Sequence, residues 1–124
     1  MTSANPLIAV VDDEAPVRTM LGRVLRVADY DVITFASGED FLASLATRVP
    51  ACLILDIHMP GLSGLDVKSR LCATHPKLPV IFITASDDPS LDQAVAEAHG
   101  AALLRKPFGS EVLLNEIGKA LQNR

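Results

Sequence analysis

The sequence lacks the features that would direct its function to a membrane or to a nucleic acid. No apolar run approaches the roughly 18 residues of a membrane span, and residues 1–6 hold no cation followed by an apolar stretch. The sequence has 11 basic and 15 acidic residues, which gives a net charge of −4. The only two basic residues that are adjacent in the sequence are Arg105 and Lys106. No basic stripe exists to neutralise phosphates along a nucleic acid. We therefore expect a cytoplasmic protein that binds neither a membrane nor a nucleic acid directly.

Cysteine is also scarce, and its spacing argues against common metal and redox sites. The two cysteines, Cys52 and Cys72, form no Cys-x-x-Cys motif. Cys52 falls in an apolar run and Cys72 in a segment with helical spacing. We expect both to be reduced thiols in the core.

What is present fits one globular domain. The chain has 124 residues, of which 49% are hydrophobic and 21% charged, a composition that neither disordered nor fibrous proteins share. A single core typically takes roughly 100–150 residues. No linker or low-complexity segment interrupts the chain, so residues 1–124 are expected to form a single domain.

Short apolar runs, each too brief for a helix, predict the strands. Most of them are continuous rather than alternating and are rich in Val, Ile and Leu, which is typical of strands buried on both faces of a parallel sheet. The runs are residues 7–11, 32–35, 52–55, 80–83 and 101–104. The second run is the weakest and suits an edge strand.

Segments with helical spacing of apolar residues follow each of these runs. They cover residues 17–28, 41–45, 67–71, 91–98 and 113–121. Ser37 and Ser63 each stand three residues before an aspartate, which is the spacing of a capping box. Asp88 is expected to cap a helix whose first turn contains Pro89, and Gly100 fits the end of that helix.

Strand and helix therefore alternate five times, which forces parallel pairing through right-handed crossovers. The predicted fold class is α/β: a doubly wound, flavodoxin-like (βα)5 fold with a five-stranded parallel sheet of order 2-1-3-4-5. Helices are expected on both faces of the sheet. The fourth helix should be the element most free to shift, because its apolar stripe holds two alanines and only two larger apolar residues.

Polar residues follow four of the predicted strands. In open parallel sheets, functional groups gather beyond the carboxyl ends of the strands, where the connections reverse direction. The residues at those ends are Asp12, Asp13, Asp56, Thr84 and Lys106. Although more than 90 positions separate the first from the last, we expect them to meet in one crevice.

The chemistry of this set points to phosphoryl transfer. Three carboxylates repel one another unless a cation lies between them, and oxygen ligands without a convergent His or Cys set favour Mg²⁺. The Lys106 ammonium and the Thr84 hydroxyl are donors that suit the oxygens of a phosphoryl group. Asp56, on a rigid central strand, is then the candidate nucleophile, and aspartyl phosphate is the expected product. Taken alone, Asp12, Asp13 and Glu14 could equally serve as caps of the first helix.

Four separated motifs carry a resemblance to a known family. They are Val11-Asp12-Asp13-Glu14, Leu53-Ile-Leu-Asp56-Ile-His-Met-Pro60-Gly-Leu-Ser-Gly64, Phe82-Ile-Thr84-Ala85 and Lys106-Pro107-Phe108. With these motifs, in this order, the chain resembles the receiver domain of bacterial two-component response regulators over about residues 7–121. The central motif is most similar to receivers of the nitrogen-fixation regulator type, which often precede a LuxR-like DNA-binding domain.

The resemblance implies a donor, an acceptor and a metal. A sensor histidine kinase or a histidine phosphotransfer protein would donate a phosphoryl group to Asp56. Mg²⁺ would be held by Asp13, Asp56 and the main-chain carbonyl of His58, and Asp12 would bind it through water. The His58 ring could instead be a metal ligand or a general acid.

The resemblance also implies a switch. Thr84 and Lys106 would contact the phosphoryl oxygens, and the Lys106-Pro107 peptide bond would be cis. Phosphorylation would draw Thr84 inward and repack the surface built from the fourth helix, fifth strand and fifth helix, which would signal to an output domain, a partner protein or a second copy of the chain. The family usually places Tyr or Phe where this chain has Leu103, so its output surface is expected to recognise a partner differently.

Two other functions use a similar set of residues or a similar fold, and the sequence fits each of them less well. A magnesium-dependent phosphatase of the haloacid dehalogenase type expects an acid at the position of His58 and an inserted cap segment, which the chain lacks. A flavodoxin-like cofactor binder expects Gly, Ser or Thr in its first loop, where Asp12 and Asp13 stand. The expected module is a signalling phospho-acceptor that catalyses only its own phosphoryl transfer and hydrolysis. Both a stand-alone receiver and part of a longer regulator remain open.

Overall fold

The computed structural model describes residues 5–122, in which every predicted strand and helix is present. The strands are β1 (Leu7–Val11), β2 (Asp31–Phe35), β3 (Cys52–Asp56), β4 (Val80–Thr84) and β5 (Ala102–Arg105). The helices are α1 (Ala15–Val27), α2 (Gly38–Ser44), α3 (Gly64–Thr74), α4 (Ser90–Glu97) and α5 (Ser110–Gln122).

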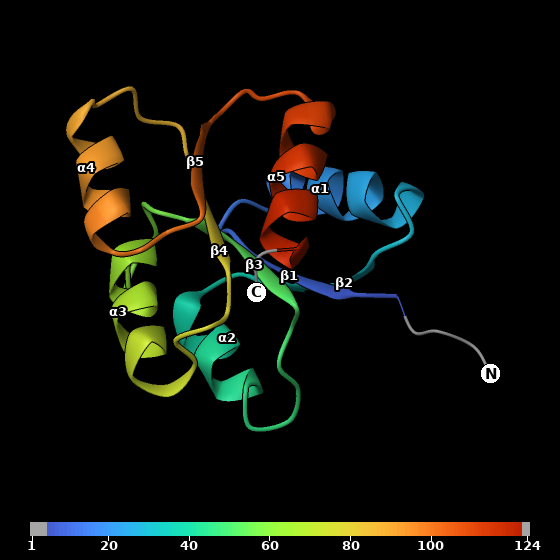
Figure 1. Ribbon diagram of the computed structural model, residues 1–124, viewed down its shortest axis with the longest axis horizontal. Helices are drawn as coiled ribbons and strands as arrows, with labels where there is room; N and C mark the ends of the chain where they lie inside the picture. Colours follow the sequence, from blue (N-terminus) through green and yellow to red (C-terminus); the bar gives the residue numbers. More distant parts are fainter. Residues whose placement is uncertain (1–4, 123–124) are drawn as a thin grey trace.

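The strands form one parallel sheet in the order β2-β1-β3-β4-β5 (Figure 1), as the alternation of strands and helices predicted. All residues of β3 and β4 are buried, whereas β2, at the edge, is only partly buried. The register keeps the strand ends level at one edge of the sheet. Val11 pairs with Leu55, so the residue after β1 lies beside Asp56, and Thr84 pairs with Arg105.

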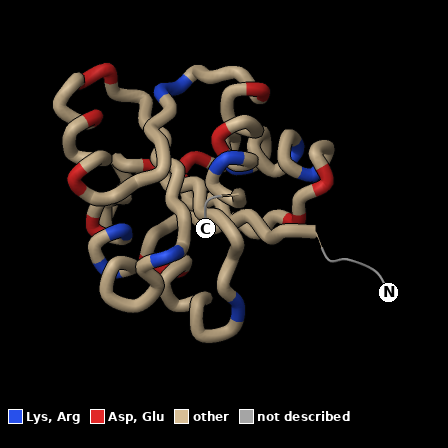
Figure 2. The backbone as a smooth tube through the Cα atoms, viewed as in Figure 1, with Lys and Arg blue, Asp and Glu red and all other residues tan. Residues whose placement is uncertain are grey.

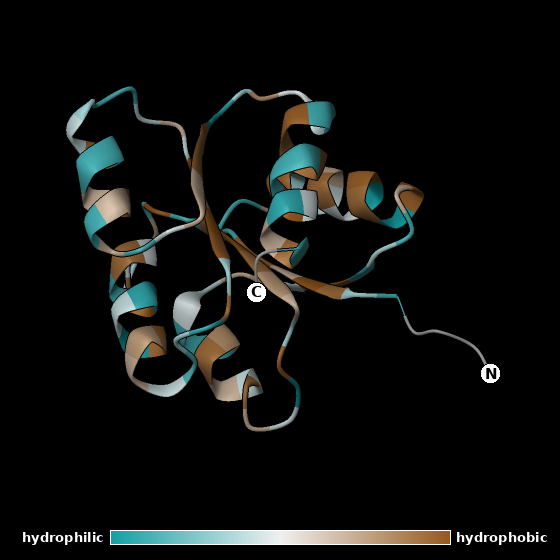
Figure 3. Cartoon of the chain, viewed as in Figure 1, coloured by the Kyte–Doolittle hydropathy of each residue, from teal (hydrophilic) through white to brown (hydrophobic). Residues whose placement is uncertain are grey.

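Side chains alternate along the strands and supply two hydrophobic layers. One layer lies between the sheet and α2, α3 and α4 and includes Phe41 and Val67; the other lies under α1 and α5 and includes Leu25 and Leu113 (Figure 1). Charged residues lie mostly on the helices and loops (Figure 2). The strands are largely hydrophobic, whereas the helices carry both hydrophobic and hydrophilic residues (Figure 3). Such helices bury their hydrophobic face and expose their hydrophilic face.

Two of the predicted helix starts are confirmed. Before α3, Ser63 Oγ accepts a hydrogen bond from Asp66 N and Asp66 Oδ2 accepts one from Ser63 N, both at 3.1 Å, which is a complete capping box. Before α2, Ser37 Oγ accepts a hydrogen bond from Asp40 N at 3.1 Å. These bonds satisfy amide groups that have no partner within their helix.

Helix α4 differs from the prediction at both ends. Pro89, not Asp88, occupies the N-cap position, although the Asp88 carboxylate still accepts a hydrogen bond of 2.9 Å from the first amide of α4. At the other end His99, not Gly100, adopts a left-handed conformation, with φ of 60°. Gly100 is needed for space instead, because a Cβ there would lie 2.7 Å from the Phe82 ring.

The prediction that both cysteines lie in the core is wrong for Cys72. Cys52 is buried in β3, and this burial raises the pKa of its thiol to about 12. Cys72 is exposed, because α3 turns Val67, Lys68 and Leu71 inward and leaves Cys72 on its outer side. Apolar spacing alone would not place a lysine on the buried side of α3, but the structure buries Lys68 there.

Some expectations about the chain ends lie outside the described residues. The expectation drawn from residues 1–6 falls partly on residues 1–4, and the expected single domain of residues 1–124 includes residues 123–124. Within residues 5–122, no helix combines the length and apolar character that crossing a membrane demands.

Candidate functional site

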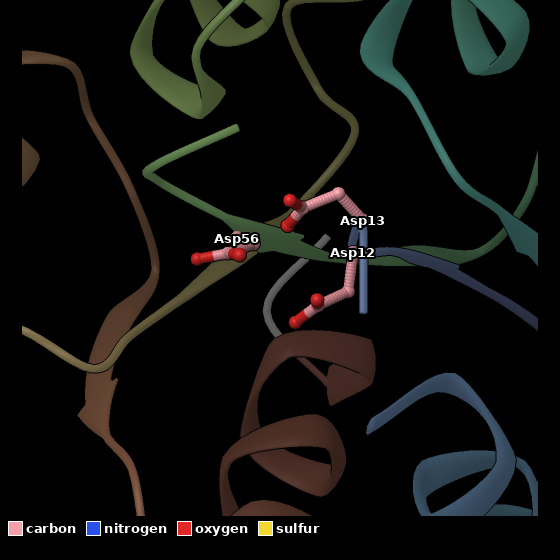
Figure 4. A group of neighbouring side chains, drawn as sticks. All are labelled: Asp12, Asp13 and Asp56. Carbon is pink, nitrogen blue, oxygen red and sulfur yellow. The ribbon is translucent and has the colours of Figure 1, made fainter. Parts of the chain in front are cut away.

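The acidic residues predicted to meet lie together at the carboxyl ends of two neighbouring strands. Asp12 and Asp13 directly follow β1, and Asp56 ends β3. Figure 4 shows Asp12 and Asp13 leaving the end of β1 on opposite sides of the chain, with Asp56 beside them. One carboxylate oxygen from each residue lies within 4.8 Å of the others. Asp12 and Asp56 are buried and Asp13 is exposed, so the cluster opens to solvent on the side of Asp13.

Asp12 is fixed by contacts from three directions. Its Oδ1 accepts a hydrogen bond from Glu14 N at 2.8 Å, and its Oδ2 accepts one from Lys106 Nζ at 2.9 Å. Its main-chain oxygen accepts a hydrogen bond from Arg18 at 2.8 Å. The N-cap residue of α1 is Glu14, whose side chain makes no capping bond. Asp12 is therefore a rigid part of the acidic cluster, and both of its carboxylate oxygens already have donors.

Lys106 brings a cation into the cluster from the end of β5, an edge strand of the sheet. It follows β5, and its Nζ lies 2.9 Å from Asp12 Oδ2, 3.7 Å from Asp56 Oδ2 and 3.5 Å from Glu14 Oε1. Burial alone would lower the pKa of this ammonium, but the hydrogen bond with Asp12 and the surrounding carboxylates raise it above its usual value. Its amide donates to Thr84 O at 2.7 Å, and the peptide bond that follows it is cis, as the resemblance implied.

Asp56 carries the strongest electrostatic conflict of the site. Burial raises the pKa of its carboxyl group, and the nearby charge of Asp12 raises it further. The Lys106 ammonium and a hydrogen bond from the amide of His58 oppose this effect, and the resulting pKa is about 6. A carboxylate with a pKa this far above the ordinary value near 4 is stabilised by an added cation.

Thr84 contributes a hydroxyl at the strand end between Asp56 and Lys106. It ends β4, which lies between β3 and β5, and it is fully buried. Its Oγ1 accepts a hydrogen bond from Ser86 N at 3.1 Å, which orients the hydroxyl. The hydroxyl hydrogen can donate to an oxygen that comes to lie beside it.

The loop after β3 is held tightly against Asp56. Gly64 N donates to Ile57 O at 2.8 Å, and a Cβ on Gly64 would overlap the carbonyl oxygen of Asp56. Only glycine permits this close approach of the two backbone segments. His58 lies in the same loop and is exposed. Among the described residues, the metal-ligand group contains three aspartates and does not include the His58 ring.

The structure also brings in three polar side chains that the sequence analysis did not assign to the site. Glu14 approaches Lys106, Arg18 donates to the main chain of Asp12, and Arg105 donates two hydrogen bonds to Asp92 on α4. Glu14 could have been suspected from its place in the first acidic motif. The contacts of the two arginines leave no periodic signal in the sequence, because they depend on how a helix and a strand end meet in space.

The residues present fit a hard divalent cation. The group offers carboxylate oxygens without nitrogen or sulfur ligands, a donor set typical of Mg²⁺ and Ca²⁺ sites rather than of structural zinc sites. The lone ammonium of Lys106 faces Asp12, Asp56 and Glu14, so negative charge remains in excess around it. An acidic cluster that could hold a metal is therefore present where the strand ends predicted it.

A comparison with protein families decides between the functions considered. The model of the response regulator receiver domain matches residues 8–118. The chain belongs to the response regulator receiver family. Receiver domains are signalling phospho-acceptors of two-component systems rather than turnover enzymes, so the phosphatase and the cofactor binder are set aside.

Individual relatives agree with this assignment. Nodulation protein W of Bradyrhizobium diazoefficiens is 32% identical over 120 residues, which are 97% of this chain and 53% of that protein. The DNA-binding transcriptional regulator NtrC of Salmonella typhimurium is 37% identical over 119 residues, 94% of this chain and 25% of that protein. A crystal structure of a response regulator receiver protein from Burkholderia phymatum is 37% identical to this chain, with a TM-score of 0.86. The match covers 95% of this chain and 96% of the Burkholderia chain. The chain thus spans about half or less of these curated relatives but nearly all of the solved receiver.

Proposed function

We propose that this receiver is a switch in which Asp56 accepts a phosphoryl group from a sensor histidine kinase or a histidine phosphotransfer protein. The observation that carries the proposal is the meeting of Asp12, Asp13 and Asp56 within 4.8 Å, with Lys106 Nζ 3.7 Å from Asp56 Oδ2. These groups come from three different strand ends. Carboxylates that share a site with one ammonium and one buried hydroxyl have the chemistry of a phosphoryl acceptor.

Asp56 is the proposed acceptor because its surroundings leave it the most reactive of the three carboxylates. In the transfer, an Asp56 carboxylate oxygen forms a bond to phosphorus, the nitrogen–phosphorus bond of the donor histidine breaks, and the departing imidazole nitrogen takes up a proton. Asp12 is already occupied by Glu14 N and Lys106 Nζ. Asp13 lies on the exposed side, where it can serve as a ligand.

The proposed metal is Mg²⁺, held by Asp13, Asp56 and the main-chain carbonyl of His58, with Asp12 binding through water. When bound, Mg²⁺ neutralises negative charge on the carboxylates and on the phosphoryl oxygens. Support comes from the all-oxygen side-chain donor set and from the raised pKa of Asp56, which is caused first by burial and then by the neighbouring charge of Asp12. Without a cation, the anionic phosphoryl group would have to approach the buried Asp56 carboxylate, which is itself an anion.

Thr84 and Lys106 are the proposed contacts of the phosphoryl group. Lys106 Nζ stands 2.9 Å from Asp12 and 3.7 Å from Asp56, so a short movement would take it to a phosphoryl oxygen on Asp56. Thr84 would turn its hydroxyl toward the same group, and the Ser86 amide that it now engages would follow. We propose that the receiver catalyses only this transfer and the hydrolysis of its own aspartyl phosphate.

The output surface is proposed to be the face built from α4, β5 and α5. Thr84 at the end of β4 is linked to β5 through the hydrogen bond from Lys106 N to Thr84 O, so its movement would be felt along β5. Leu103 of β5 is partly buried and packs against the layer that contains α4. Leu103 thus gives this surface an aliphatic side chain. The surface would bind an output domain, a partner protein or a second copy of the chain.

For the whole protein we propose a cytoplasmic response regulator in which residues 1–124 form one receiver domain. A DNA-binding output is supported by relatives such as NtrC, whose name describes a DNA-binding transcriptional regulator. The central motif around Asp56 narrows this proposal to an output of the LuxR-like type. The receiver itself would make no direct contact with nucleic acid, in keeping with its net charge of −4.

The test is phosphorylation by a small donor. Purified protein incubated with acetyl phosphate and Mg²⁺ should gain one labile phosphoryl group by intact-mass measurement, and chelation of Mg²⁺ should prevent the gain. Labelling that is indifferent to a chelator would contradict the metal role, and no labelling in Mg²⁺ together with none from phosphorylated kinases or phosphotransfer proteins would contradict the acceptor role.

A further inference from the structure

A cavity of about 590 Å³ lies at the end of the sheet opposite the acidic cluster. Residues that precede β4 and β5 form its floor, and α3 and α5 contribute side chains to its walls. Its volume falls within the roughly 300–1,000 Å³ of small-molecule sites. Since β4 contains five residues that each rise about 3.3 Å, the cavity is roughly 15 Å away from Thr84 and is a separate place on the molecule.

The most unusual residue of this cavity is Lys68. It belongs to α3 and is only 3% exposed, although lysine is rarely buried without an ionic partner. Among residues 5–122, no carboxylate oxygen lies within the 4.0 Å of an ion pair with its Nζ. The contact that the ammonium does make is a weak hydrogen bond of 3.4 Å to Cys72 Sγ. A buried ammonium in this position lacks an anion.

The remaining charges of the cavity do not supply that anion. Lys77 and Lys119 also line it, and Glu116, its only acidic lining residue among those described, lies 3.7 Å from Lys119. Three lysines and one glutamate leave two positive charges without a partner, in a chain whose net charge is −4. His99, on the α4–β5 connection, adds a further nitrogen donor.

We propose that this cavity binds a small dianion, either a phosphate ester or a dicarboxylate, with Lys68 as its buried anchor and Lys77 and Lys119 at its mouth. The two uncompensated charges match a dianion, and the low exposure of Lys68 makes its interaction with an anion stronger than that of a surface lysine. The ligand would rest against residues that precede β4 and β5, the strands that end at Thr84 and Arg105.

The test uses inorganic phosphate and succinate as separate probes, without divalent cations. In amide NMR spectra of the whole chain, at least one of the two probes should cause saturable shifts centred on residues 68, 77, 78, 101 and 119–120. Shifts with phosphate alone would identify a phosphate-ester site, shifts with succinate alone a dicarboxylate site, and shifts with both a site that reads charge. The absence of saturable shifts with both probes, or shifts centred on Lys106, would overturn the proposal.

Matched variants separate this site from general charge effects. Lys68→Met should raise the apparent dissociation constant of the active probe at least about tenfold, because it removes the buried charge but keeps the length of the side chain. Arg70→Met removes one positive charge from an exposed position on the same helix and outside the cavity, so it should bind as the parent does. Lys77→Met changes an exposed position and should also weaken binding. Equal affinity in Lys68→Met, Lys77→Met and Arg70→Met would overturn the proposal.

Discussion

Arg105 at the end of β5 donates two hydrogen bonds to Asp92 in the first turn of α4, from Nη1 to Oδ1 at 3.2 Å and from Nη2 to Oδ2 at 3.1 Å. The same Nη2 also donates to Asp88 O at 2.9 Å. These bonds join α4 to the residue directly before Lys106. They supplement a small apolar anchor, because α4 buries only Leu91 and Val95.

We predict that Arg105→Gln loosens α4 without unfolding the domain. The substitution removes both bonds to Asp92 and the bond to Asp88 O, so the amides of α4 should exchange with solvent faster than in the parent. Hydrogen-exchange NMR measures this, with Arg48→Gln, an exposed arginine after α2, as the matched control. Unchanged protection in α4 would show that Leu91 and Val95 suffice to hold it.

The raised pKa of Asp56 predicts a pH dependence of stability in the absence of metal. The folded-state pKa is about 6, against an ordinary value of 3.8. Below pH 3.8 the group is protonated in both states and contributes nothing, and above pH 6 it is ionised in both, so the unfavourable contribution is fully present. Ionisation of Asp56 should therefore destabilise the fold progressively as the pH rises through this window.

Asp56→Asn isolates this effect. The unfolding free energy of the variant minus that of the parent should rise by roughly 1–3 kcal/mol as the pH increases from 4 to 7, because each pKa unit corresponds to about 1.4 kcal/mol. Urea denaturation with a chelator present, at several pH values, gives the difference directly. A difference that stays constant with pH would mean that burial and Asp12 do not raise the pKa of Asp56.

Magnesium should reverse this destabilisation. At a concentration about 100 times its dissociation constant, Mg²⁺ should stabilise the parent by about 2.7 kcal/mol at pH 7, and a chelator should abolish the gain. Asp13→Asn should weaken the effect because it removes one ligand of the cluster. Asp29→Asn makes the same charge change at a turn after α1, where the left-handed φ of 69° suits asparagine, and should respond as the parent does. Thermal unfolding with and without Mg²⁺ compares the three proteins, and an equal response in all of them would exclude Asp13 as a ligand.

Gly64 and Gly118 predict opposite effects of the same substitution. Gly64→Ala would place a methyl group on the carbonyl of Asp56 and 3.0 Å from the Cα of Ile57, so it should destabilise the domain by roughly 1–3 kcal/mol and displace Asp56. Gly118 lies in α5, and a Cβ added there would have no neighbouring atom within 4 Å outside the helix's own backbone. Gly118→Ala should therefore stabilise the domain by roughly 0.5–1 kcal/mol. Denaturant unfolding measures both changes, and a neutral Gly64→Ala would show that the loop after β3 can yield.

The fold was predictable because its signals are local and agree with one another. Continuous apolar runs fix the strands, helical spacing fixes the helices, and Ser63 with Asp66 marks a helix start that forms as expected. Parallel pairing then brings the strand ends together without any long-range information, which is why Asp12, Asp56 and Lys106 could be placed in one cluster.

What the sequence could not predict depends on contacts between elements. The burial of Lys68 and the exposure of Cys72 follow from how α3 turns against the sheet, a rotation that its apolar positions alone do not determine. The bonds of Arg105 to α4 depend on the distance between a strand end and a helix, and no spacing along the chain reports that distance.

The most direct test of the account identifies which aspartate carries the phosphoryl group. Asp12, Asp13 and Asp56 lie within 4.8 Å of one another, so peptide mass spectrometry of the protein phosphorylated by acetyl phosphate and Mg²⁺ must discriminate between neighbours. We predict modification of Asp56 alone and none in Asp56→Asn. A phosphoryl group on Asp12 or Asp13 in the parent, or undiminished labelling of Asp56→Asn, would contradict this prediction.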